Sequence, residues 1–241
     1  MRGRNTYHFR DSVNILLKTR WISPYLLVPP MLAFMVYAEA YLSAHGITGI
    51  FNLEQRTVLA IWNGSLLLTL IAGIKSCLFF SRMWESEWFR NSLALPVNRS
   101  SAFWGPYFAV LTVVSVVFVL TLGAVSAALP EPGSFPLVQV IVESYVPVVW
   151  AVSVGAFLGI LTTGTAGSIF FAALLLLGFL TGLPVARFPE WIYTVIPPVG
   201  RILSMGLLYP KGVFQVVILI LHSVVFLILG RLLFSIGSKR R

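Results

Sequence analysis

The sequence predicts an all-α integral membrane protein with six transmembrane helices, and three observations lead to this prediction. First, 58% of the 241 residues are hydrophobic and only 10% are charged, whereas soluble domains are about 45–50% apolar and about 25% charged. Second, apolar stretches of about 20 residues or more recur, which is the length that a helix needs to cross a hydrocarbon core about 30 Å thick. Third, the mean hydropathy is +0.89, so little of the chain is expected outside the bilayer.

Residues 1–21 are predicted to form an amphipathic helix at the membrane surface, with Trp21 at the level of the lipid headgroups. Its apolar side chains recur on one side at helical spacing: Phe9, Val13, Leu16 and Leu17. Its polar and basic side chains fall largely on the other side: Arg10, Asn14 and Lys18. The alternative is that this segment is a plain N-terminal tail whose positive charge only keeps it on the cytoplasmic side. A second alternative is a cleaved signal peptide ending near "AEAYLSAHG", but the apolar stretch exceeds the usual 7–15 residues.

Six stretches of about 20–25 residues are the predicted spans, and together they form a single transmembrane domain over residues 1–241. The predicted spans are 22–43, 57–80, 106–129, 137–161, 167–186 and 213–234. Residues 184–210 contain too many prolines for a further span, because proline interrupts a helix. Two short half-helices dipping into the outer leaflet are expected there.

The basic residues predict that both termini are cytoplasmic, because cytoplasmic loops carry an excess of Lys and Arg. With the N-terminus inside, twelve of the seventeen Lys and Arg residues fall on the inner side. They are Arg2, Arg4, Arg10, Lys18, Arg20, Arg82, Arg90, Arg99, Arg231, Lys239, Arg240 and Arg241. The outer side has four, Arg56, Arg187, Arg201 and Lys211, and Lys75 lies inside the second predicted span near its cytoplasmic end. The net charge of +9 is therefore attributed to basic residues that flank the spans, and no nucleic-acid partner is predicted.

Two carboxylates inside the predicted spans are candidates for a translocation path. Glu39 lies near the outer end of the first span and Glu143 near the outer end of the fourth. Ionisable groups in a bilayer are costly and are functional candidates for that reason. The alternative is that both simply reach water at the interface.

Small residues predict close helix contacts in the fourth and fifth spans. Gly155 and Gly159 are four residues apart, as are Gly178 and Gly182. This spacing lets two helix backbones approach closely. The pattern does not distinguish a contact within one chain from a seam between two copies.

The chain shows none of the common motifs of catalysis or nucleotide binding. It has no G-x-x-x-x-G-K-[ST], no H-E-x-x-H and no G-x-S-x-G. Its one cysteine, Cys77, leaves no internal disulfide and no cysteine-cluster metal site. No catalytic residue, no metal site and no cofactor of its own is predicted for this chain, which is not expected to be an enzyme.

The loop between the second and third spans gathers charge in an otherwise apolar chain. It reads "ESEWFRNSLALPVNR" over residues 85–99. Residues 83–95 are expected to form a helix that Pro96 ends. Trp88 would face the membrane surface, and Glu85 and Glu87 would face the cytoplasm or another protein. Glu87 and Arg90, three apart, would support this helix.

This loop resembles the coupling helix in the membrane subunit of type-2 ABC transporters. In that family an acidic residue is followed by apolar residues and a closing "P-V-x-R"-like step. Here Glu85 takes the acidic place, and Pro96 and Arg99 belong to the closing step. The layout is also similar over the whole chain: the N-terminal elbow helix, six spans, the short turn after the fourth span and the outer half-helices. In the middle, where the family has Gly-Thr and a second Glu, this chain has Glu87, Trp88 and Arg90.

The resemblance implies a permease subunit of a bacterial ABC exporter in the inner membrane, moving a hydrophobic or amphipathic substrate. Two copies of a separate ATP-binding subunit, which would bind ATP and Mg²⁺, and a second permease, identical or similar, would be its partners, with membrane lipid around them. The coupling contacts would fall on Glu85, Glu87, Trp88, Arg90, Pro96 and Arg99.

Three alternatives remain from the sequence. The chain could be the membrane part of a haem- or envelope-related ABC assembly. It could be a carrier or channel driven by an ion gradient, using Glu39, Lys75, Glu143 and His222, although these residues are scattered. The loop helix itself could be a linker with no docking role.

Overall fold

A computed structural model describes residues 5–18, 23–44, 53–86, 99–128, 137–180, 196, 199 and 212–237. Every regular element within these ranges is a helix, as predicted. Four stretches are long and apolar enough to cross a membrane: Gly64–Glu85, Ala102–Val125, Ile141–Leu161 and Phe214–Ile236. The described part of the chain is therefore the helical bundle of a membrane protein.

The helices follow the order of the predicted spans. They are α1 (Asn5–Lys18), α2 (Ser23–Leu26), α3 (Val28–Ala44), α4 (Leu53–Glu85), α6 (Arg99–Ala128), α7 (Leu137–Leu161), α8 (Gly164–Leu180) and α11 (Gly212–Gly237). The first and fifth predicted spans overlap α3 and α8, which have 17 residues each. These two are shorter than the four helices above, so the total of six spans stays a prediction. The expected half-helices at 184–210 lie almost wholly outside the described residues.

Two helix boundaries at the second loop differ from those expected. Helix α4 continues to Glu85, five residues beyond the predicted span end, and α6 begins at Arg99, well before Pro106. The expected start of a separate loop helix at Met83 is therefore wrong, because Met83 belongs to the last turn of α4. Hydropathy marks where the apolar stretch stops, whereas a helix continues through the polar interface as long as its backbone bonds are made.

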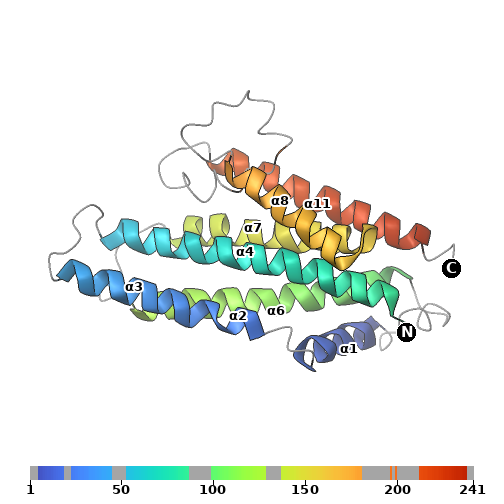
Figure 1. Ribbon diagram of the computed structural model, residues 1–241, viewed down its shortest axis with the longest axis horizontal. Coiled ribbons are helices and arrows are strands. Elements are labelled where there is room, and N and C mark those ends of the chain that lie inside the picture. Colours follow the sequence, from blue (N-terminus) through green and yellow to red (C-terminus); the bar gives the residue numbers. More distant parts are fainter. Residues whose placement is uncertain are drawn as a thin grey trace.

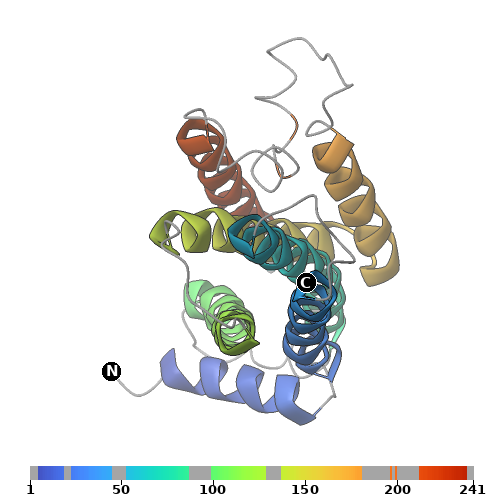
Figure 2. The same ribbon diagram turned by 90° about the vertical axis from the view of Figure 1, so that its left-hand side faces the viewer.

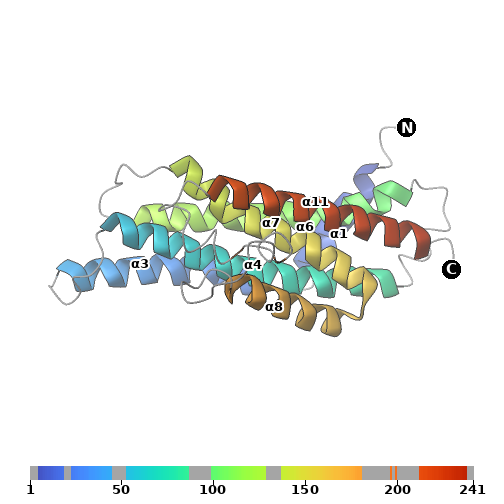
Figure 3. The same ribbon diagram turned by 90° about the horizontal axis from the view of Figure 1, so that it is seen from above.

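Helices α4 and α7 run side by side through the middle of the bundle (Figures 1 and 3). Helix α4 also contacts α3, α6 and α8, and α7 also contacts α6, α8 and α11. In the spanning windows of α4 and α7, 61% and 67% of the residues are buried, against 39% in α6 and 28% in α11. Helices α4 and α7 therefore form the core, and α6 and α11 present most of their surface outward.

A stripe of small residues on α4 lets α7 approach closely. It consists of Ser65, Thr69, Gly73, Cys77 and Ser81, at four-residue intervals. Gly155 lies on this stripe so closely that an added Cβ would be 2.6 Å from the carbonyl oxygen of Gly73. At Gly159, an added Cβ would be 2.5 Å from the carbonyl oxygen of Cys77. This contact joins two helices of one chain. Of the second glycine pair, Gly178 is buried in α8, and Gly182 lies outside the described residues.

Helix α1 lies across the direction of the other helices and packs against α6 (Figure 2). Leu16 is fully buried in this contact, and Val13 packs against the core. Phe9 and Leu17, expected on the same side, are exposed instead, as are the basic residues. The buried side of α1 is thus narrower than the apolar pattern predicted, because among the described residues α1 packs mainly against one helix, α6.

Replacing Gly159 by alanine is expected to destabilise the bundle by about 1–3 kcal/mol, the usual cost of overpacking a close contact. Thermal unfolding of the detergent-solubilised protein measures this. Gly123→Ala in α6 is the matched control, because nothing lies within 4 Å of its added methyl group and alanine is favoured in a helix by about 0.5–1 kcal/mol. Equal stability of the two variants would contradict the close α4–α7 contact.

Candidate functional site

Several helix ends gather at one end of the bundle, which we call the basal end. Here α4 and α11 end, α6 begins, and the chain turns at Thr162 and Thr163 from α7 into α8 (Figures 1 and 3). Helix α1 lies at the same end. All these segments are ones that the distribution of Lys and Arg predicts to be cytoplasmic. The basal end is therefore the candidate functional site.

An aromatic cluster connects three helices at the basal end, and we call it the aromatic base. It consists of Phe80 and Trp84 of α4, Phe103, Trp104 and Tyr107 of α6, and Phe234 of α11. Phe103 is at its centre and is fully buried. Its ring centroid lies 6.2 Å from that of Phe80 and 5.6 Å from that of Phe234. The rings of Trp84 and Phe234 are 5.2 Å apart.

The aromatic base fixes the two helices that flank residues 87–98. Helix α4 enters that segment and α6 leaves it, and Phe80 and Trp84 meet α6 and α11 within the last two turns of α4. Aromatic pairs of this kind contribute about 0.5–1.5 kcal/mol each beyond their buried area. A force applied to the segment would therefore reach α4, α6 and α11 together.

Hydrogen bonds to Glu85 and from Ser86 organise the end of α4. The hydroxyl of Ser81 donates to Oε1 of Glu85 over 3.3 Å. Ser86 ends the helix by donating from its backbone N–H and its hydroxyl to the carbonyl oxygen of Met83, at 3.2 and 2.8 Å. Glu85 is exposed. A carboxylate in the last turn of a helix is unfavourable with respect to the helix dipole, so helix stability does not explain why it is there.

The predicted coupling residues are only partly described. Glu85 is the last residue of α4 and Arg99 the first of α6, so the structure brings both ends of the loop to the basal end. The remaining predicted coupling residues lie outside the described residues: Glu87, Trp88, Arg90 and Pro96.

The two predicted path carboxylates belong to different helices, away from the basal end. Glu39 lies in the second half of α3, and only its backbone is described. Glu143 lies in the second turn of α7, and its side chain is only 3% exposed. So small an exposure of the Glu143 side chain does not agree with the alternative in which this side chain simply reaches water at the interface. Pro147, four residues later, has no N–H to donate to the carbonyl of Glu143, so the α7 ladder lacks that bond.

Buried and half-buried hydroxyl groups form a second set of contacts that sequence reasoning did not identify. Tyr107 and Ser153 share a hydrogen bond of 3.0 Å, and Ser115 and Tyr145 share one of 2.6 Å. Both pairs connect α6 to α7. On the other side of α7, the hydroxyl of Ser65 donates to the carbonyl oxygen of Ser144. Such bonds between membrane helices contribute about 0.6 kcal/mol on average, so they align the helices more than they stabilise them.

The aromatic base was also missed, although the sequence carries a signal of it. Phe103, Trp104, Tyr107 and Phe108 recur three and four residues apart just after the charged loop. That spacing places neighbours on one helix face. What the sequence does not show is that Phe80 and Phe234, far away along the chain, complete the cluster.

No protein-family model matches the chain, and no curated protein matches it. Within the described ranges, no three His, Cys, Asp or Glu residues come together in a way that could hold a metal ion. The chemistry of the site rests on the residues described above.

Phe103→Ala is expected to lower the free energy of unfolding by about 3 kcal/mol or more, the usual cost of removing a buried phenylalanine ring. Thermal unfolding in detergent is the measurement. Phe170→Ala serves as the control, because Phe170 is 61% exposed on α8 and takes no part in the aromatic base. If the two variants unfold at the same temperature, the base does not hold these helices together.

Proposed function

We propose that the chain is the permease subunit of an ATP-driven ABC exporter of the type-2 class. The observation that supports this best is the basal end. The segment that resembles a coupling helix connects α4 to α6, and the aromatic base joins those two helices to α11 at the point where the segment leaves them. An ATPase docked on the segment would therefore act on the core of the bundle.

In this proposal α4 is the helix that moves first and transmits the movement to the rest of the bundle. Its basal end would be displaced when the two ATP-binding subunits close, and its contact with Gly155 and Gly159 would pass the displacement to α7. Closely packed helices shift as units because their interiors deform little. The energy must come from contacts that the ATPase makes in one state and not the other. ATP and Mg²⁺ would be bound by the ATPase.

The assembly would contain two ATP-binding subunits and a second permease, identical or similar, in a bacterial inner membrane. Both termini would be cytoplasmic, which agrees with the position of α1 and of the end of α11 at the basal end (Figure 1). The substrate would be hydrophobic or amphipathic and would enter from the bilayer, along the apolar outward faces of α6 and α11.

Charge reversal at Glu85 and Glu87 together, to lysine, is expected to abolish association with the ATPase while leaving membrane insertion normal. The measurement is co-purification with ATPases encoded beside the chain, followed by ATP hydrolysis. Asp11→Lys is the control, because it reverses a carboxylate in the same way, at one position instead of two, on α1 at the basal end, outside the segment.

Two results would contradict the proposal. One is that no such ATPase co-purifies with the unaltered chain. The other is that the doubly reversed variant binds the ATPase and transports as well as Asp11→Lys does, which would leave the segment as a linker.

The burial of Glu143 favours a second candidate, a carrier driven by an ion gradient, because a carboxylate buried in a membrane helix is a common proton or cation site. Glu143→Gln separates the two. If the chain is a carrier, the unaltered protein takes up its substrate into proteoliposomes when an ion gradient is applied and no ATPase is present, and Glu143→Gln loses this uptake. A permease would show no uptake under those conditions in either form.

A further inference from the structure

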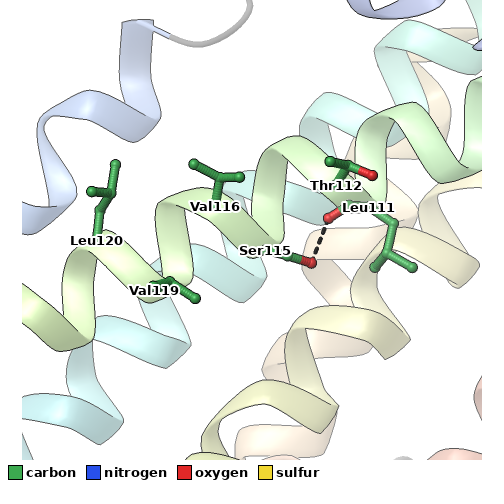
Figure 4. A pocket seen from close by; sticks show the side chains of 6 residues that line it. All are labelled: Leu111, Thr112, Ser115, Val116, Val119 and Leu120. Carbon is green, nitrogen blue, oxygen red and sulfur yellow. Dashed lines mark hydrogen bonds between the residues drawn. The ribbon is translucent and has the colours of Figure 1, made fainter.

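An apolar depression lies on the outward face of α6, and we call it the α6 groove. Its lining residues are Leu111, Thr112, Ser115, Val116, Val119 and Leu120 (Figure 4). Its volume is about 420 Å³, within the range of about 300–1,000 Å³ typical of small-molecule sites. Four of the six lining residues are exposed on the surface of the bundle, so the groove is reached from the membrane.

The groove has few polar groups with which a ligand could form hydrogen bonds. Its most buried polar group, the Ser115 hydroxyl, already donates to the carbonyl oxygen of Leu111 at 2.7 Å and shares a hydrogen bond with Tyr145. Figure 4 shows the bond to Leu111 running along α6 itself. A ligand that fits this surface must therefore be apolar where it lies in the groove.

A fixed positive charge stands at the basal end of the same helix face. The guanidinium carbon of Arg231 lies 6.0 Å from the ring centroid of Trp104, a cation–π contact. Trp104, Phe108 and Ser115 are four and seven residues apart, which places them on one face of α6. Phe108 is 48% exposed and stacks on Trp104 at 5.6 Å. It thus continues the apolar surface from the cation to the groove.

The Arg231 side chain is available to an anion. It is exposed, and no carboxylate within the described ranges forms an ion pair with it. Its position over Trp104 orients the side chain, so the Arg231 side chain would lose less conformational entropy when an anion binds. Tryptophan and arginine are side chains typical of the headgroup level of a membrane.

We propose that this face binds one anionic phospholipid of the surrounding membrane, with its headgroup phosphate on Arg231 and one acyl chain ending in the α6 groove. The dimensions agree. Along the helix axis, Leu111 is about 10 Å and Ser115 about 17 Å from Trp104. One acyl chain fills half of a hydrocarbon core about 30 Å thick. The proposal does not rest on the proposed transport function, because Arg231 and the groove lie outside the segment that an ATPase would contact.

Native mass spectrometry of the detergent-purified chain, titrated with phosphatidylglycerol or with phosphatidylcholine of the same acyl chains, tests the headgroup. The unaltered chain is expected to prefer phosphatidylglycerol about fivefold, the effect of one basic residue near a lipid surface. Arg231→Gln should abolish this preference. Arg82→Gln is the control, because Arg82 is an exposed arginine at the basal end of α4, outside this face.

Thr112→Trp tests the groove by filling it while leaving Arg231 in place. It should weaken phosphatidylglycerol binding severalfold, whereas Val225→Trp, which adds the same bulk at a half-exposed position of α11, should not. The proposal is overturned if Arg231→Gln keeps the preference, if Arg82→Gln loses it equally, or if the two tryptophan variants bind alike.

Discussion

Two glycines of α7, Gly155 and Gly159, lie against the carbonyl oxygens of Gly73 and Cys77 in α4, so closely that a methyl group would not fit between the helices. The remaining arrangement depends on this contact. In lipid no hydrophobic effect drives one apolar helix onto another, so association rests on close van der Waals packing and on the few available hydrogen bonds. Once α4 and α7 are paired, they offer the surfaces on which the other helices pack.

The outer helices meet that pair in two different ways. Helix α6 is joined to α7 by two hydroxyl pairs and to α4 by the aromatic base. Helix α8 places the ring of Phe171 against Trp150 and against the space left by Gly73. Small residues thus set how near two backbones come, and aromatic side chains occupy the wider gaps. The helices of the bundle are consequently packed most closely at its centre and at its basal end.

The charged side chains that bear on the proposals lie at opposite ends of the bundle. Exposed Glu85, Arg82 and Arg231 lie at the basal end, where they meet water, lipid headgroups or another protein. Glu143 is buried near the opposite end. A docking partner and a lipid headgroup would both be received at the basal end, on different helices: the partner beside the end of α4, and the headgroup beside α11.

The pattern of apolar runs along the sequence determined that the chain is a helical membrane protein, because a run of about 20 apolar residues satisfies its own backbone in lipid as a helix. The positions of these runs also determined the order of the elements, and the four-residue spacing of Gly155 and Gly159 indicated a close contact. Local pattern fixed the helix ends less well: α4 extends to Glu85 and α6 begins at Arg99, since polar interface residues continue a helix that hydropathy does not follow. The tertiary structure alone decided that the glycines of α7 face α4 and not a second copy, and that Phe80, Phe103 and Phe234 form one cluster. It also placed Arg231 over Trp104. These contacts join residues far apart along the chain, and periodicity within one helix shows which side chains share a face but not which helix that face will meet.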